Sequence, residues 1–308
     1  MRQNAPYSLS KLPPIREKVE TLEILRQLSK SSKSLGELKG IAQTMPNQEM
    51  LINAVVLQEA KDSSEIENII TTQDELYKAL ATNSKQGDRV KEVINYRKAI
   101  FLGHKLLKEQ GFLRLNDIEY LQKTIIENNA GIRKLPGTVL KNDKTGEVVY
   151  TPPQEKEHIL DLLGNFLDHF NLKQEDFPPL INLAILHYQF ESIHPFYDGN
   201  GRTGRILNIL YLTINDLLDI PILYLSSYIN ENKADYYRLL NKVNKSDEWE
   251  EYILYILKAI EVTANRTIAK INSINSLLSE TIEIAQSKEP KIYRKELIEL
   301  LFEQPYSK

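Results

Sequence analysis

The side chains best suited to chemistry lie in residues 194–205, which read HPFYDGNGRTGR. This stretch contains an imidazole, a carboxylate, an amide and two guanidiniums, carried by His194, Asp198, Asn200, Arg202 and Arg205. A neutral imidazole with the ordinary pKa of about 6.5 can accept a proton near neutral pH, so His194 is the candidate general base. Guanidiniums are forked donors that suit phosphate oxygens. The stretch therefore predicts a site for transfer chemistry on a nucleotide's phosphate chain.

Glycines stand on both sides of Asn200, at Gly199 and Gly201. They allow the backbone to turn its N–H groups inward as an anion-binding nest, and the helix expected to follow directs its positive dipole end at the same place. Arg202 and Arg205 are three residues apart, so they share one face of that helix and can hold successive phosphates. Asp198 would repel bound phosphate unless a cation lay between them. Mg²⁺ is the cation expected there, because it binds one or two carboxylates together with phosphate oxygens.

At these residues the chain resembles the Fic family, whose motif HPFx[D/E]GNGRxxR it matches at every specified position. The resemblance implies protein AMPylation, the transfer of AMP from ATP to a protein hydroxyl with release of pyrophosphate. It also implies an all-α fold, a Fic-type helical bundle with a small β-hairpin flap. The nucleotide-binding residues it implies within the motif are Gly199, Asn200, Gly201, Arg202, Gly204 and Arg205. Their G-x-G-x-x-G spacing also fits a dinucleotide fingerprint, but that fingerprint needs a buried strand before its first glycine, whereas a helix is expected here.

A second motif lies at residues 63–68, which read SSEIEN. Ser63, Glu67 and Asn68 match the Fic inhibitory pattern [S/T]xxxE[G/N], and the resemblance implies that Glu67 pairs with Arg205 and blocks the γ-phosphate. The alternative is local: a serine at position 64 followed by Glu67 is also a capping box that starts a helix. The first interpretation predicts an inhibitory helix at about residues 62–70, in the same polypeptide as the catalytic motif and preceding it.

Most of the chain has the spacing of apolar residues typical of helices, including residues 180–192 before the motif and the segment after it. One segment differs: residues 139–150 have β-branched ends around a turn-forming centre, which predicts a hairpin. Its simplest interpretation is an exposed excursion. The resemblance suggests instead a flap that registers the target by strand-like pairing, through Val139, Leu140, Val148 and Val149. Adenosine contacts are expected from Tyr228, Asn232 and Tyr236, although aromatic residues at helical spacing are more often core.

The sequence assigns no catalytic or metal-binding role to the other histidines. His187 and Glu191 share a helical face, but with His194 they fit no standard zinc spacing, and Pro195 directs the third ligand away. His187 is therefore expected to be a packed core histidine. His104, His158 and His169 are given no role.

The chain length and motif positions predict three parts. Residues 1–112 form an N-terminal helical region, 113–262 the catalytic core, and 263–308 a helical extension whose end, from Tyr293, resembles the opening of a winged helix. With no cysteine, thiol catalysis, cysteine metal sites and disulfides are excluded, which fits the cytosol. A net charge of -3 argues against broad nucleic-acid binding, and no apolar stretch has the length needed to span a bilayer.

These observations predict a cytoplasmic, Mg²⁺-dependent protein adenylyltransferase inhibited by Glu67, with ATP and a hydroxyl-bearing protein as its partners. The expected acceptor is the hydroxyl of a Ser, Thr or Tyr, in another protein or in this protein itself. The sequence does not decide whether the protein forms a homodimer. Two alternatives remain. The same site could remove AMP or transfer another nucleotide or phosphoester group, or the chain could be a regulator that acts through a winged-helix tail.

Overall fold

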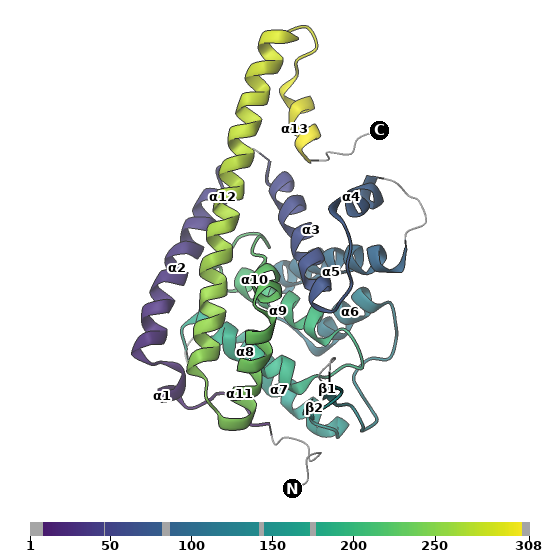
Figure 1. Cartoon of the computed structure of the whole chain (residues 1–308), viewed down its shortest axis with the longest axis vertical. Helices are drawn as coiled ribbons and strands as arrows, with labels where there is room; N and C mark the ends of the chain where they lie inside the picture. Colours follow the sequence, from purple (N-terminus) through teal and green to yellow (C-terminus); the bar gives the residue numbers. More distant parts are fainter. Residues whose placement is uncertain (1–8, 46, 82–86, 142–144, 173–176, 304–308) are drawn as a thin grey trace.

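The computed structural model describes residues 9–45, 47–81, 87–141, 145–172 and 177–303. These residues fold into helices and one short hairpin, as the sequence predicted (Figure 1). The helices are α1 (Arg16–Val19), α2 (Leu22–Ala42), α3 (Gln48–Ile66), α4 (Gln73–Ala81), α5 (Asp88–Gln110), α6 (Leu115–Ile126), α7 (Lys156–Asn171), α8 (Pro179–Ile193), α9 (Asn200–Ile214), α10 (Leu225–Glu231), α11 (Lys233–Ser246), α12 (Glu250–Lys288) and α13 (Lys295–Glu303). The strands are β1 (Leu140–Lys141) and β2 (Val148–Tyr150).

Helix α8 is the central element of the body. The helix carries apolar side chains on every face, and all but a few of its residues are buried. It packs against α7, α9 and α12, and Pro179 at its first turn fits the fixed φ of proline. A helix that is apolar all round requires such a central position, because each of its faces must be removed from water. The catalytic motif follows directly from this well-fixed helix.

Helix α12 is much longer than its neighbours, with 39 residues. Its first part lies along α2 and α8, whereas its last turns extend beyond the body, where α13 packs back against it (Figure 1). The predicted boundary between residues 262 and 263 falls inside this continuous helix. The core and the C-terminal extension therefore share one helix.

The hairpin forms where it was predicted, with strands shorter than the segment 139–150. Leu140 pairs with Tyr150 and Lys141 with Val148 in an antiparallel register that contains an irregularity. Val139 lies just before β1, and residues 142–144 of the turn fall outside the described residues. Val148 and Val149 are partly exposed, whereas the Tyr150 side chain is buried and fastens the hairpin to the body.

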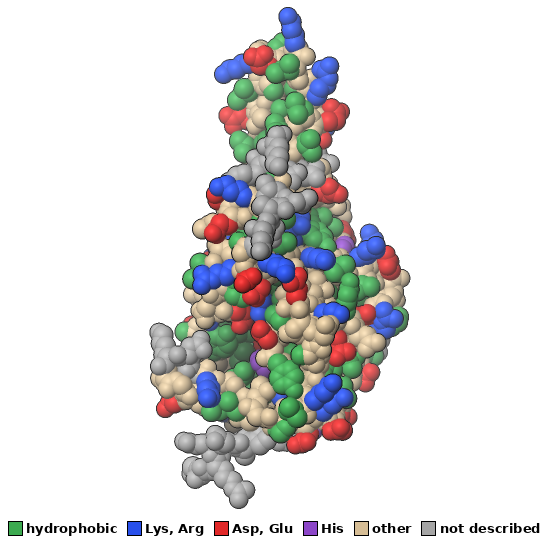
Figure 2. Space-filling model, turned by 90° about the vertical axis from the view of Figure 1, so that its right-hand side faces the viewer, with side chains coloured by type: hydrophobic (Ala, Val, Ile, Leu, Met, Phe, Trp, Pro, Cys, Tyr) green, Lys and Arg blue, Asp and Glu red, His purple; other side chains and the backbone are tan. Residues whose placement is uncertain are grey.

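The surface carries charges of both signs. Figure 2 shows lysine and arginine side chains intermixed with aspartate and glutamate side chains over one face of the molecule. Among the described residues, no helix combines the length and the apolar character needed to cross a membrane.

Candidate functional site

The catalytic motif occupies the connection between α8 and α9. Helix α8 ends at Ile193, and His194 follows in the left-handed region with φ 48°. Helix α9 begins at Asn200, with Gly199 as its N-cap at φ 80°. The left-handed conformation suits glycine, which has no Cβ to clash with its backbone. The predicted helix after the motif is confirmed, and its N-terminal N–H groups open on the loop.

Asn200 closes this loop with its side chain. Its Oδ1 accepts a hydrogen bond from the Phe196 backbone N–H at 2.8 Å, and its Nδ2 donates to the Phe196 carbonyl at 2.8 Å. Asn200 itself is only 3% exposed. Both polar atoms of the side chain therefore hold the loop backbone in shape.

Gly201 leaves space for the charged groups of the site. A Cβ at Gly201 would lie 2.5 Å from Glu67 Oε1 and 2.8 Å from Arg205 Nη1, closer than real Cβ contacts allow. The glycine therefore allows a carboxylate and a guanidinium to meet directly above the first turn of α9.

Gly204 leaves space for side chains of α8. A Cβ there would lie 2.5 Å from Glu191 Oε1 and 3.1 Å from Phe190, both on α8. Gly204 is buried, and its missing side chain allows α8 to approach α9 closely. The Glu191 carboxyl is itself buried, which raises its pKa to about 7.

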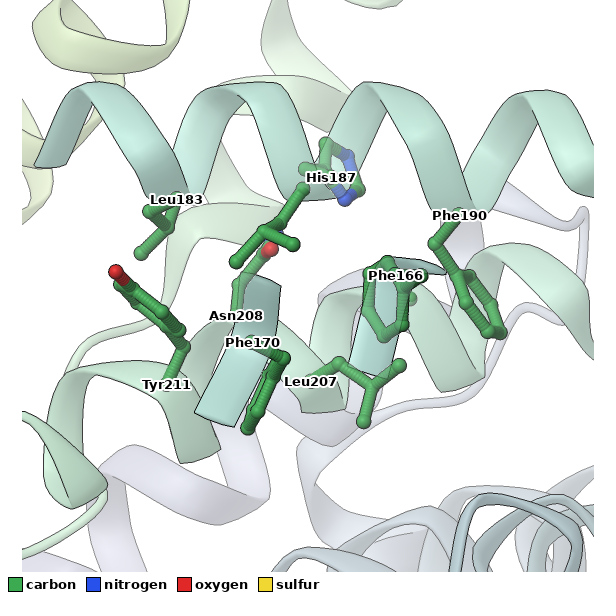
Figure 3. A pocket seen from close by; sticks show the side chains of 10 residues that line it. Phe166, Phe170, Leu183, His187, Phe190, Leu207, Asn208 and Tyr211 are labelled. Carbon is green, nitrogen blue, oxygen red and sulfur yellow. The ribbon is translucent and has the colours of Figure 1, made fainter. Parts of the chain in front are cut away.

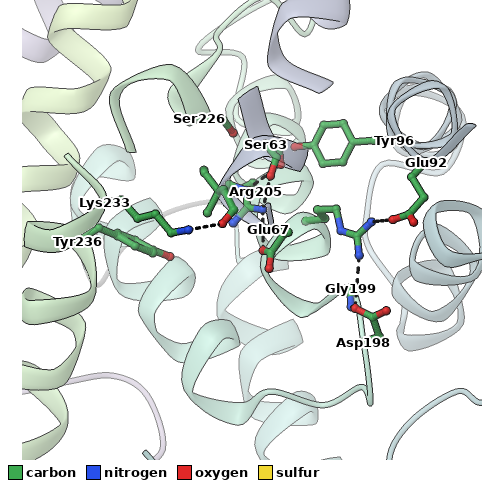
Figure 4. A network of polar contacts seen from close by, with 12 residues as sticks. Ser63, Glu67, Glu92, Tyr96, Asp198, Gly199, Arg205, Ser226, Lys233 and Tyr236 are labelled. Atoms are coloured by element: carbon green, nitrogen blue, oxygen red, sulfur yellow. Dashed lines mark hydrogen bonds and ion pairs between the residues drawn. The ribbon is translucent and has the colours of Figure 1, made fainter. Parts of the chain in front are cut away.

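Arg205 is paired with the end of α3 (Figure 4). Its Nε donates to Ser63 Oγ at 2.7 Å, and its Nη2 donates to the Ser63 carbonyl at 2.9 Å and to Glu67 Oε1 at 3.0 Å. The Arg205 side chain is 2% exposed. Ser63 and Glu67 together therefore occupy donors of the guanidinium that the sequence assigned to phosphate.

The pair is held by charge, with the Arg205 side chain buried and the Glu67 side chain 36% exposed. Burial opposes ionisation of the Glu67 carboxyl, but the Arg205 guanidinium outweighs it and lowers the pKa of Glu67. Burial likewise opposes the charge on Arg205, and Glu67 reverses this effect, so the pKa of Arg205 is raised. Each group keeps its partner ionised, which is the condition for a strong charge-assisted hydrogen bond.

The inhibitory helix predicted at about residues 62–70 does not form as a helix of its own. Helix α3 runs from Gln48 to Ile66, so Ser63 and Glu67 lie at the end of a long helix and not in a helix of their own. Asn68 follows with φ 64°, a conformation that asparagine tolerates and that stops the helix. The capping-box interpretation is wrong for the same reason, because it requires a helix start.

Arg202 is held by two carboxylates. Its Nη1 donates to Glu92 Oε2 on α5 at 2.5 Å, and its Nη2 donates to Asp198 Oδ1 at 3.3 Å (Figure 4). The Asp198 carboxylate is 64% exposed, and Oδ1 also accepts the Gly199 N–H at 2.6 Å. Both of these contacts use Oδ1, and much of the carboxylate stays exposed. An exposed carboxylate oxygen beside a helix N-terminus fits a hard cation that shares phosphate oxygens.

The described residues contain no group of three or more His, Asp or Glu side chains arranged to hold a metal ion on their own. His187 is a buried core residue, as predicted, and its Nε2 lies 2.8 Å from the Tyr236 hydroxyl. Burial lowers the pKa of His187 to about 3.

His194 lies at the rim of the core and is partly buried. Burial is the main reason that its pKa is lowered to about 4, and the nearby Arg133 guanidinium adds to the effect. The ring is therefore neutral at physiological pH, as a general base requires.

The three residues expected to contact adenosine lie on or beside α10 and α11. Tyr228 is partly buried, with its ring 5.3 Å from that of Tyr255. The Asn232 amide donates to the Tyr228 carbonyl at 2.9 Å. Tyr236 is 1% exposed and its hydroxyl is engaged by His187, so in this structure it belongs to the core.

A small cavity lies behind the motif, between α7, α8 and α9 (Figure 3). It is lined by aromatic and aliphatic side chains together with His187, Gly204 and Asn208. The volume open to the centre of a water molecule is about 10 Å³, which is room for about one water. This cavity is too small for a nucleotide.

The sequence interpretation missed several residues that shape the site. Glu92, Arg133, Glu59 and Lys233 all contact the motif or the elements that hold it. A charged residue at a helical position normally indicates a solvent-facing side. Only the meeting of remote segments reveals which groups these charges contact.

Comparison with known proteins gives three family models along the chain. The model of the Fic/DOC family matches residues 112–212, and that of the Fic/DOC family N-terminal region matches residues 25–105. The chain belongs to the Fic/DOC family. A third model, the C-terminal domain of protein adenylyltransferases like SoFic, matches residues 277–308 of this Fic chain, where a winged-helix start was expected.

Two curated relatives of this Fic chain carry the name protein adenylyltransferase. The chain is 29% identical over 163 residues to fic-1 of Caenorhabditis briggsae, covering 51% of this chain and 29% of that protein. It is 25% identical over 185 residues to Fic of Aedes aegypti, covering 58% of this chain and 34% of that protein. The chain thus spans about a third of the length of these relatives.

Solved Fic structures share the fold. A Fic family protein from Desulfovibrio desulfuricans aligns with a TM-score of 0.67 at 20% identity, over 84% of this chain and 77% of that one. Fic-1 (aa134–508) from Caenorhabditis elegans aligns with a TM-score of 0.62 at 22% identity, over 81% and 73%. The predicted all-α class is confirmed.

Proposed function

We propose that this Fic protein is an autoinhibited adenylyltransferase that transfers AMP from ATP to a Ser, Thr or Tyr hydroxyl of a protein. The observation that carries the proposal is the meeting of three features at the start of α9. These are the neutral His194 ring, the open helix N-terminus and the buried Arg205 held by Glu67. The names of the curated relatives support the same reaction.

The reaction is a displacement at the α-phosphorus of ATP. His194 accepts the proton of the attacking hydroxyl, and the hydroxyl oxygen forms a bond to the α-phosphorus. The bond from that phosphorus to the oxygen bridging the α- and β-phosphates breaks, and pyrophosphate leaves with the bonding electrons. N–H groups at the start of α9 face the charge that develops on the α-phosphate.

The remaining residues of the motif act on the rest of the phosphate chain. Arg202 and Arg205 donate to the β- and γ-phosphates once their present carboxylate partners release them. Asp198 would hold Mg²⁺ through its exposed carboxylate, and the ion would neutralise phosphate charge. Because most of the catalysis is positioning, small displacements are costly.

Inhibition follows from competition for one guanidinium. Glu67 and Ser63 occupy donors of Arg205 that the terminal phosphate needs, so ATP cannot take the aligned position while α3 is seated. A misplacement of about 1 Å can cost roughly 100-fold in rate. Release of Glu67 is therefore the step that switches the enzyme on.

The test uses labelled ATP, Mg²⁺ and cell lysate with the wild type, two variants and one control variant. Glu67→Gly should label protein about 10- to 100-fold faster than the wild type, because Arg205 becomes available to phosphate. Adding His194→Ala to Glu67→Gly should reduce that labelling by about 10²- to 10⁴-fold. The matched control is Glu65→Gly, the same exchange two residues earlier, where the carboxylate pairs with Lys61.

Mass spectrometry of the labelled protein identifies the transferred group. An added AMP on a hydroxyl residue supports the proposal. Another added mass, or removal of AMP from a premodified protein by the wild type, would replace it with a related reaction at the same site. If Glu67→Gly labels no faster than Glu65→Gly, the inhibitory role of Glu67 is wrong.

A further inference from the structure

The carbonyls at the end of α8 are capped by side chains from around the hairpin. A helix leaves its last carbonyls without partners inside the helix. Here the Tyr150 hydroxyl donates to the Ser192 carbonyl at 2.8 Å. The Arg133 guanidinium donates to the carbonyls of His194, through Nε at 2.8 Å, and of Ile193, through Nη2 at 3.4 Å. Three consecutive carbonyls, the last that of His194 itself, are thus held from outside the helix.

Both donors belong to the segments that carry the hairpin. Tyr150 is the last residue of β2, and Arg133 lies in the segment that leads into β1. The Arg133 Nη2 also donates to the Pro153 carbonyl at 2.8 Å, just after β2. One guanidinium therefore joins the two bases of the hairpin to the end of α8.

The same segment is fastened to the residues that follow His194. The Arg133 backbone N–H donates to the Pro195 carbonyl at 2.9 Å, and Ile132 forms a bridge pair with Phe196. The backbone on both sides of His194 is thus tied to one short stretch, residues 132–133.

The chemistry of Arg133 suits this position. The residue is 0% exposed, and its side chain donates to the backbone carbonyls of His194, Pro153 and Ile193. A cation at the C-terminal end of a helix interacts favourably with the helix dipole. The planar fork can meet several carbonyls at once, which the ammonium of a lysine does with less defined geometry.

We propose that the hairpin presents the acceptor hydroxyl, and that Arg133, together with Tyr150, is a positioning residue of the transfer reaction that fixes the His194 ring relative to the hairpin. The proposal rests on the function proposed above. Without these two side chains, only the backbone contacts of residues 132–133 join the hairpin segment to the residues after His194, so the distance between base and acceptor is less sharply defined. Misplacement of this kind reduces the rate of the chemical step while nucleotide binding, which takes place at α9, is retained.

The test is made in the Glu67→Gly protein, where transfer is measurable. Arg133→Met should lower kcat by about 10- to 100-fold and leave the KM for ATP and the affinity for a non-hydrolysable ATP analogue within about 2-fold. Arg133→Lys should restore part of kcat, because a lysine still donates to carbonyls at the helix end. Tyr150→Phe should lower kcat by a smaller factor, since it removes one donor and keeps the ring.

Arg97→Met is the matched control. Arg97 is a partly buried arginine on α5 whose Nη2 donates to Asn53, away from the motif. We expect kcat in this variant to stay within about 2-fold of the parent. If Arg133→Met fails to fold, as judged by its thermal transition, Arg133→Lys and Tyr150→Phe carry the test.

A second measurement does not depend on catalysis. The chain has five histidines, so the ring signals of ¹³C-labelled histidine can be followed by NMR in the nucleotide-free protein. Arg133→Met and Tyr150→Phe should shift or broaden the His194 signal and leave the His158 signal in place. Arg97→Met should shift neither.

Three outcomes overturn the inference. They are an unchanged kcat in folded Arg133→Met, a loss expressed only in KM for ATP, and an unmoved His194 signal. Failure of the proposed function looks different, because Glu67→Gly with intact Arg133 would then transfer no AMP. In that case the NMR comparison alone decides whether Arg133 and Tyr150 fix His194.

Discussion

At the scale of single residues, the charge state of His194 decides whether it can act as the general base of the proposed reaction. Burial lowers its pKa to about 4, so the neutral form that accepts a proton predominates at any pH well above that value. We predict that kcat of Glu67→Gly at saturating ATP and Mg²⁺ stays nearly constant from about pH 8 to pH 5.5. An ordinary histidine, with a pKa of about 6.5, would lose most of its activity by pH 5.5. A pH profile of transfer measures this, and a midpoint near pH 6.5 would contradict the proposed burial of the ring.

Glu59 is a buried carboxyl on α3 that links three helices. It accepts hydrogen bonds from Ser226 N at 3.0 Å on α10 and from the Tyr96 hydroxyl at 3.0 Å on α5, and it also contacts Ser226 Oγ. Burial outweighs these bonds and raises its pKa to about 7. The folded protein therefore holds this proton more tightly than the unfolded chain. Stability contributed by the protonated carboxyl is present at pH 4.5 and is lost as the pH rises to about 7.

This linkage predicts how Glu59→Gln behaves. Glutamine does not ionise, so the free energy of unfolding of the variant should rise relative to the wild type by roughly 2 to 3 kcal/mol between pH 5 and pH 8. Urea unfolding at both pH values measures the difference. Because Glu191 titrates in both proteins, it cancels in the comparison. Parallel pH dependence of the two proteins would show that Glu59 does not carry the shift.

At the scale of elements, the end of α3 that leads to Glu67, the proposed inhibitory residue, is held by α11. Lys233 Nζ donates to the Ile66 carbonyl at 2.6 Å, one residue before Glu67 (Figure 4). A lysine at a helix C-terminus satisfies a free carbonyl and complements the dipole. We predict that Lys233→Met raises wild-type transfer about 2- to 5-fold, since loss of about 0.5 to 1 kcal/mol of capping frees Glu67 more often.

The double variant tests the route of this effect. In the Glu67→Gly background, Lys233→Met should add no further increase, because the inhibitory carboxylate is already gone. Initial rates of labelling for the four proteins form the cycle. Equal effects of Lys233→Met in both backgrounds would mean that Lys233 acts on the site by another path.

At the scale of the whole molecule, the first and the last turns of α12 lie in different environments. Its first part is buried against α2 and α8, with Ile256 and Ile260 almost without exposure. Its last turns extend beyond the body beside α13, and Leu277 and Ile284 are 55% and 46% exposed. We predict that amides in residues 277–288 exchange with deuterium at least about 10-fold faster than those in 253–264, because local opening there exposes little additional apolar surface. Hydrogen-exchange mass spectrometry measures this, and uniform protection along α12 would contradict it.

The sequence by itself determined the class of the fold and predicted the chemistry. The motif 194–205 supplies the candidate base, the acidic residue and the two guanidiniums, and the helical spacing of apolar residues predicts the all-α architecture that the structure has. These properties are local, because helix formation and the shared face of Arg202 and Arg205 depend on residues a few positions apart. The hairpin was predicted for the same reason, since a turn and its flanking strands are neighbours in the chain.

Only the tertiary structure decided which remote groups meet. It placed Ser63 and Glu67 at the end of α3 and against Arg205, although Glu67 and Arg205 are 138 residues apart in the sequence. The sequence had also allowed a helix start in this segment. The tertiary structure also turned the Asn200 side chain to the loop backbone and directed Arg133 to the end of α8. Such contacts depend on how whole helices pack, and packing joins surfaces whose partners no local spacing specifies.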